Sequence, residues 1–128
     1  MMKFKIVAVI ASVLSFFNAV FFILAPVLTL SLLGRDTNLT GIMTTRLFGA
    51  CALGLAVITW LARDAKNPEI RTWISFGMAI TLGLLAVIDL NGIISGAMNS
   101  LGWMLFVADL SLSICFVLLV FTDRGKHP

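Results

Sequence analysis

The sequence predicts an all-α integral membrane protein: one domain of four transmembrane helices in an up-down bundle. The chain has 128 residues, of which 60% are hydrophobic and only 12% are charged, whereas soluble domains carry about 25% charged residues. Four apolar segments each approach the roughly 20 residues that a helix needs to cross the hydrocarbon core. Short connections separate them, as expected for antiparallel neighbours in a bundle.

The four spans are expected at about residues 6–25, 41–62, 70–90 and 102–121. Lys3 and Lys5 precede the first span, as they would a signal peptide. Its apolar run is longer than the roughly 7–15 residues of such a leader, and no polar cleavage segment follows. We therefore expect the first span to be retained.

The connections carry the signals that end each span. Pro26 removes a helix hydrogen bond, so the first span ends or kinks there. The segment PVLTLSLLG then favours a short interfacial helix, with Pro26 in its first turn and Gly34 as its stop. Pro68 marks the break in a charged turn, RDAKNPEIR, between the second and third spans. The uncharged segment NGIISGAMNSLG, residues 91–102, is expected as an interfacial connection between the last two spans.

The nine Lys and Arg residues divide unequally between the two sides of this arrangement. One side holds Lys3, Lys5, Arg63, Lys66, Arg71, Arg124 and Lys126, and the other holds Arg35 and Arg46. Loops rich in Lys and Arg stay in the cytoplasm, so both termini are expected there. Trp60, Trp73 and Trp103 fall near span ends, as aromatic-belt residues do.

The candidate polar residues of the predicted spans are the ionisable Arg46, Asp89 and Asp109, with Asn18 as the main uncharged addition. At about 1.5 Å per helical residue, all four lie in the outer half of the membrane. Ionisable residues in spans are rare and mark functional positions by default. These four residues are the candidate intramembrane polar cluster.

Arg46 lies near the amino end of its span, where the helix dipole disfavours a cation. An acidic partner would remove that conflict. We hypothesise a buried ion pair between Arg46 and Asp109, with Asp89 and Asn18 as secondary partners. Snorkelling of Arg46 to the outer interface is the alternative, and Asp89 is also consistent with an interfacial residue at a helix end.

Most enzyme and metal chemistry lacks its usual residues here. The only histidine, His127, lies in the polar tail, and Cys51 and Cys115 lie in apolar runs without ligand spacing. No Gly-rich phosphate loop, HExxH or GxSxG motif occurs. We therefore expect no enzyme, no metal centre and no cofactor. Without a basic stripe outside the spans, we expect no nucleic-acid partner.

Short motifs are distributed along the chain: Ala25-Pro26, Gly34, RLFGA at residues 46–50, WLAR at 60–63 and LGW at 101–103. On these motifs the chain resembles a broad set of short, uncharacterised bacterial membrane proteins with four spans. The resemblance implies a protein of the bacterial inner membrane without an assigned activity. Small multidrug transporters have a similar length, but their membrane-embedded glutamate in the first span is missing here.

The leading functional hypothesis is a structural, accessory or interaction role in the lipid bilayer. Ala50 and Gly54 form a small-xxx-small pair, which favours a homo-oligomer or a membrane-protein partner. One alternative is a small oligomeric transporter or channel that uses Asp109 as a proton- or cation-coupling site. The other alternative is a binder of lipid or of a small hydrophobic ligand.

Overall fold

The computed structural model describes residues 3–125 and contains five helices in that range. They are α1 (Phe4–Leu24), α2 (Pro26–Leu32), α3 (Leu39–Ala62), α4 (Pro68–Ile94) and α5 (Gly102–Arg124). The four long helices are long and apolar enough to cross a membrane. The predicted all-α, four-span fold is confirmed, and the chain is a multi-pass membrane protein. Lys126 and His127 lie outside the described residues.

The third span's helix extends beyond the expected span. α4 continues to Ile94, four residues into the segment predicted as an interfacial connection. The helical ladder persists because the Ser95 amide donates to the Asn91 carbonyl at 2.9 Å. The buried side chain of Met98 then folds back over Gly92. The connection is therefore shorter than its composition suggested.

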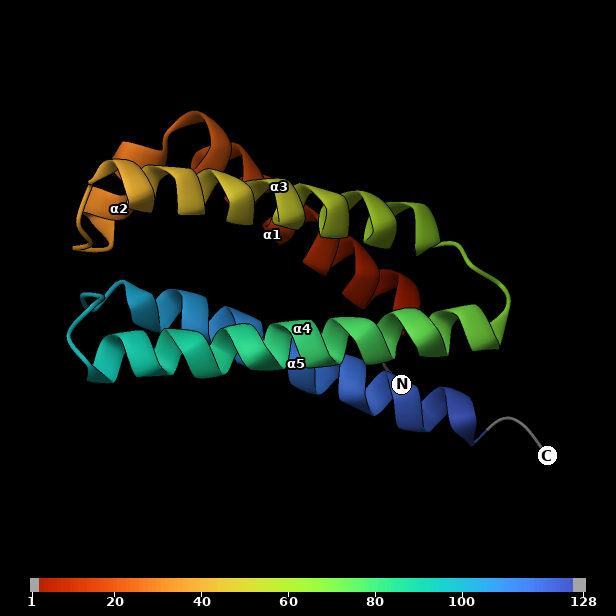
Figure 1. Ribbon diagram of the computed structural model, residues 1–128. Coiled ribbons are helices and arrows are strands. Elements are labelled where there is room, and N and C mark those ends of the chain that lie inside the picture. Colours follow the sequence, from red (N-terminus) through yellow and green to blue (C-terminus); the bar gives the residue numbers. More distant parts are fainter. Residues whose placement is uncertain (1–2, 126–128) are drawn as a thin grey trace.

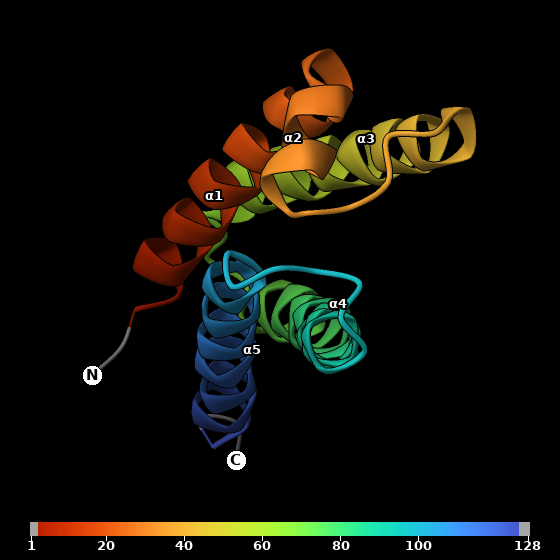
Figure 2. The same ribbon diagram turned by 90° about the vertical axis from the view of Figure 1, so that its left-hand side faces the viewer.

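The four long helices form two hairpins. Figure 1 shows α1 and α3 side by side in one layer, with α2 at its end, and α4 and α5 in the other layer. Nearly all contacts between helices lie within these hairpins. Figure 2, viewed from the end that carries α2, shows the two layers diverging from each other. Much of the surface between the hairpins therefore has no partner within the described chain.

Small residues allow the helices of each hairpin to approach closely. In the first hairpin, the Ser12 hydroxyl donates to the Ala56 carbonyl at 2.7 Å. In the second, the Ser113 hydroxyl donates to the Ala79 carbonyl at 2.8 Å. Hydrogen bonds of this kind stabilise helix pairs in membranes by roughly 0.6 kcal/mol on average.

The hairpins share a core at one end only. Its buried residues are Phe4, Val7, Ala8, Ala11, Met78, Ala79, Leu82, Leu112, Phe116 and Leu119. The α1 residues of this core all come from the first half of α1, and Phe116 of α5 is fully buried. We call this the basic end of the bundle, because Lys3, Lys5, Arg63 and Arg71 lie there around one cavity.

The opposite end is held together through its connections, and we call it the Asn99 end. Gly34 takes a φ of 70°, a left-handed conformation that ends α2, and the predicted short helix after the first span is confirmed. The Asn99 backbone amide then donates to the Leu33 carbonyl at 2.9 Å, and its side-chain amide to the Leu32 carbonyl at 2.7 Å. Asn99 thus joins the two hairpins.

Candidate functional site

Two carboxyl groups meet inside the membrane-spanning region. Asp89 of α4 and Asp109 of α5 come within hydrogen-bonding reach of each other, and both are half-buried. The antiparallel packing of α4 on α5 produces this meeting, because the Ser113–Ala79 hydrogen bond fixes the register. Because like charges repel, two carboxylates in contact are an unusual arrangement within spans.

The arginines of the Asn99 end take different positions relative to this carboxyl pair. Arg35, just beyond α2, lies close enough for its charge to act on Asp89. Arg46 is exposed on α3. The three ion pairs among residues 3–125 involve neither Arg46 nor Asp109. The predicted Arg46–Asp109 pair is therefore not formed within one chain.

The pairing of the helices explains why Arg46 and Asp109 do not meet within one chain. α3 packs on α1 and α2, with only slight contact to α4, so Arg46 is not directed at α5. Asn18 is half-buried on α1 and lies two turns beyond Ala11, the last α1 residue of the shared core. The structure thus brings together Asp89 and Asp109 and leaves Arg46 and Asn18 on the other hairpin.

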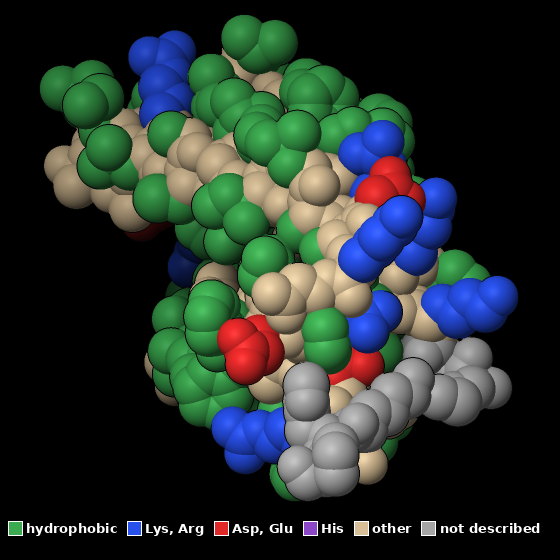
Figure 3. All heavy atoms as spheres, turned by 90° about the vertical axis from the view of Figure 1, so that its right-hand side faces the viewer, with side chains coloured by type: hydrophobic (Ala, Val, Ile, Leu, Met, Phe, Trp, Pro, Cys, Tyr) green, Lys and Arg blue, Asp and Glu red, His purple; other side chains and the backbone are tan. Residues whose placement is uncertain are grey.

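A second polar cluster occupies the basic end. We define the basic-end cluster as Lys3, Lys5, Arg63, Asp64, Arg71 and Asp123, which together line a cavity of about 410 Å³. Figure 3 shows Lys and Arg side chains gathered around Asp or Glu side chains on this face. With four cations and two carboxylates, the cluster carries a net charge of about +2 at neutral pH.

Asp64 neutralises part of the charge on one side of the cavity. Its carboxylate pairs with the Lys5 ammonium at 2.7 Å and with Nε of Arg63 at 3.4 Å. The Lys5 hydrogen bond lowers the pKa of Asp64 from its ordinary value of 3.8. Arg63 is also held in place by Trp60, because it donates to the Trp60 carbonyl and lies 4.1 Å from the centre of the indole.

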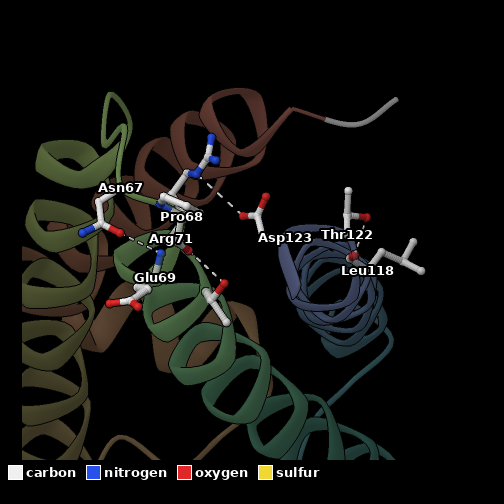
Figure 4. Close-up of polar contacts among 8 residues, drawn as sticks. Asn67, Pro68, Glu69, Arg71, Leu118, Thr122 and Asp123 are labelled. Carbon is white, nitrogen blue, oxygen red and sulfur yellow. Dashed lines mark hydrogen bonds and ion pairs between the residues drawn. The ribbon is translucent and has the colours of Figure 1, made fainter. Parts of the chain in front are cut away.

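Arg71 and Asp123 face each other on the other side of the cavity. Nε of Arg71 lies 3.7 Å from Oδ2 of Asp123, and Figure 4 shows the two side chains pointing toward each other from α4 and α5. This separation is too long for a hydrogen bond. The Asp123 side chain is only 6% exposed and the Arg71 side chain 27%. The two charges attract each other while their facing polar atoms stay unsatisfied.

Comparison with known proteins gave no matching family model, no matching curated protein and no matching solved structure. The function is therefore argued from the two polar clusters. Among residues 3–125, no group of three His, Cys, Asp or Glu side chains is placed to hold a metal ion.

An apolar groove of about 340 Å³ runs between α1 and α3. Its walls include Phe16, Phe17, Val57 and Trp60, and the Ser12 hydroxyl at its base is engaged with Ala56. Because the groove is open and almost entirely apolar, lipid acyl chains can fill it without any specific recognition.

The sequence interpretation missed the basic-end cluster. It used Lys3, Lys5, Arg63 and Arg71 only to orient the chain and gave Asp123 no role. One signal was available, since Asp123 lies at the end of the fourth span and Arg71 at the start of the third, and the ends of antiparallel spans meet.

Proposed function

We propose that this chain is a bacterial inner-membrane protein with both termini in the cytoplasm, and that it serves as a structural or accessory subunit. It acts by associating with a second copy of itself in the bilayer. The exposed Arg46, at the depth of the half-buried Asp109, carries this proposal.

The depth argument supports a partner inserted in the same direction. Arg46 lies seven residues after Leu39, the first residue of α3, and Asp109 seven residues after Gly102, the first of α5. Both helices begin at the Asn99 end, so each charge lies roughly 10 Å along its helix. A second copy would therefore present Asp109 at the level of Arg46.

The two-fold symmetry of a dimer would double this contact. In an isologous interface, each copy offers the same patch, so two Arg46–Asp109 pairs form together. Pairing also removes the cost of leaving a guanidinium against lipid, which isolated ionisable residues in spans incur. Leu47 and Met43 beside Arg46 are exposed, and they supply apolar surface for the same contact.

Self-association can be measured by energy transfer between two labelled populations in vesicles of increasing lipid content. Arg46→Gln and Asp109→Asn should each weaken association about tenfold, corresponding to roughly 1.4 kcal/mol. Lys66→Gln is the matched control, because it removes an exposed cation from the turn between α3 and α4. It should leave the dissociation constant unchanged.

Mixing the two variants distinguishes pairing between copies from a general structural effect. A dimer of one Arg46→Gln copy and one Asp109→Asn copy keeps one intact pair and strands no charge, so it should form more readily than either variant alone. No recovery on mixing would refute the pair. Monomeric wild-type protein at every lipid ratio would refute the dimer.

A proton-coupled transporter or channel is a second candidate, and the contact between Asp89 and Asp109 favours it. Chains of carboxyl groups within spans form proton relays in pumps and transporters. Uptake into reconstituted vesicles that responds to pH and is lost in Asp109→Asn, but not in the exposed loop variant Asp36→Asn, would support this function. Impaired association without flux under any gradient would support the accessory role.

A further inference from the structure

The cavity at the basic end has the features of a built binding site. Its volume of about 410 Å³ lies within the roughly 300–1,000 Å³ range of small-molecule sites. Both hairpins contribute to it: Lys3, Lys5 and Arg63 come from the first, and Arg71 and Asp123 from the second. A ligand here would therefore contact both halves of the molecule.

Two side chains that line this cavity, those of Arg71 and Asp123, have buried polar atoms without a hydrogen-bond partner. Within residues 3–125, the buried side-chain atoms that lack a hydrogen-bond partner are Nε of Arg71, Oγ of Ser75 and Oδ2 of Asp123. Ser75 is fully buried one turn beyond Arg71 and does not line the cavity, whereas Arg71 and Asp123 do, and Asp123 is only 4% exposed. An unsatisfied buried polar group destabilises the fold, so the two groups that line the cavity favour a polar ligand.

The charges indicate an anion with hydrogen-bond donors of its own. Asp64 already pairs with Lys5 and Arg63, whereas none of the three ion pairs includes Lys3. Lys3 is therefore positioned to bind phosphate oxygens. Arg71 is too, because its Nε lies 3.7 Å from Asp123 and has no hydrogen-bond partner. Guanidinium and ammonium groups are well suited to phosphate. The Asp123 carboxylate would repel a bare phosphate, but it can accept from an ammonium or hydroxyl group on the same ligand.

The surroundings favour a lipid as the source of that phosphate. The cavity lies at the ends of the spans, where headgroups are found, and Phe4 and Leu119 add apolar walls. Basic pockets between spans commonly hold phospholipid headgroups. We propose that the basic-end cavity binds a phosphate group that carries its own hydrogen-bond donor, as in a phosphoethanolamine or phosphoglycerol headgroup. Arg71 and Lys3 hold the phosphate, and Asp123 accepts from the donor.

Native mass spectrometry of the purified protein with defined lipids tests this site. Phosphatidylethanolamine should bind at least fivefold more tightly than phosphatidylcholine, whose quaternary ammonium has no N–H to donate. Asp123→Asn should reduce this preference, because a neutral amide oxygen accepts an N–H bond from an ammonium group more weakly than a carboxylate does. Equal binding of the two lipids by the wild-type protein would overturn the role of Asp123.

Cation variants test the phosphate contacts. Arg71→Gln should weaken phosphatidylethanolamine binding about tenfold. Lys3→Gln, at an exposed position where folding is not at risk, should weaken it about threefold. Arg35→Gln removes one cation from the Asn99 end and should leave binding unchanged. Equal losses in all three variants would mean that only overall charge matters, and the site would be refuted.

A soluble ligand separates the two possible sources of the phosphate. Glycerophosphoethanolamine carries the same headgroup without acyl chains. If it binds, and binding weakens in Arg71→Gln, the cavity recognises the free phosphate compound as well as the lipid. Binding of the lipid alone, with the same loss in Arg71→Gln, identifies the membrane as the source. Retention of either ligand by Arg71→Gln and Lys3→Gln at wild-type levels would overturn the proposal.

Discussion

Gly49 of α3 should be among the positions least tolerant of an added methyl group. A Cβ there would lie 2.8 Å from Cγ1 of Ile23, 2.9 Å from Cβ of Phe22 and 3.2 Å from the Ile23 backbone nitrogen. A backbone nitrogen and a Cβ cannot move away unless α1 separates from α3. Overpacking of this kind costs about 1–3 kcal/mol, against a gain in helix propensity of about 1 kcal/mol from replacing glycine by alanine.

Gly54 on the same helix isolates the packing contribution. Outside its own stretch of helix, no heavy atom of the described residues lies within 4 Å of a Cβ built at Gly54, so within one chain Gly54→Ala should change only the helix propensity. The unfolding free energy of Gly49→Ala should therefore be about 1–3 kcal/mol lower than that of Gly54→Ala. Unfolding in mixed micelles of a mild detergent and dodecyl sulfate, followed by tryptophan fluorescence, measures both variants. Equal stabilities would contradict the close approach of α1 and α3.

Three further predictions concern single polar contacts. Ser12→Ala removes the bond to the Ala56 carbonyl and should lower the unfolding free energy in the same micelle assay by about 0.6–1.7 kcal/mol. Lys5→Met should raise the pKa of Asp64 toward its ordinary value of 3.8, as a carboxyl-carbon NMR titration would detect. Because the wild-type pKa of Asp64 is lowered, the Lys5–Asp64 contact stabilises the fold at pH values above the ordinary pKa of 3.8. This stabilisation is lost as the pH falls through the lowered pKa of Asp64. Asn99→Ala removes the side-chain hydrogen bond to the Leu32 carbonyl at the end of α2. It should therefore speed hydrogen exchange in α2, measured by mass spectrometry. Unchanged exchange would mean that Asn99 does not restrain α2.

The sequence predicted the spans well because their signals are local. Hydropathy and length identify a span whatever it packs against, and Pro26 with Gly34 defined the short second helix. The packing partners were not predictable in the same way. In lipid every face of a span is apolar, so the pattern does not mark the face that meets another helix. The helix contact falls on Gly49, whereas the predicted small pair, Ala50 and Gly54, is exposed.

The candidate intramembrane polar cluster shows the same limit, because its packing partners could not be predicted from the sequence. Counting residues from the span ends gives the depth of a side chain, and the similar depth of Asp89 and Asp109 is consistent with their contact. Which partner a side chain meets depends on the pairing of the helices. α5 pairs with α4 rather than α3, so Asp109 meets Asp89 and not Arg46. Arg71 and Asp123 come together through the same pairing.

The junction between the hairpins links the two proposals. Each hairpin is closed by a serine that donates to an alanine carbonyl of its partner helix, whereas the core shared by the hairpins is confined to the basic end. At the Asn99 end, the angle between the hairpins is restrained by the two hydrogen bonds of Asn99 rather than by a shared core. A headgroup in the basic-end cavity would contact both hairpins and limit that angle, and a dimer contact through Arg46 and Asp109 would also involve both hairpins.

Two ligands that favour the same arrangement of the hairpins must strengthen each other's binding equally. Phosphatidylethanolamine should therefore tighten self-association more than phosphatidylcholine does, and Arg71→Gln should abolish the difference. Equal association in both lipids would show that the two sites are energetically independent.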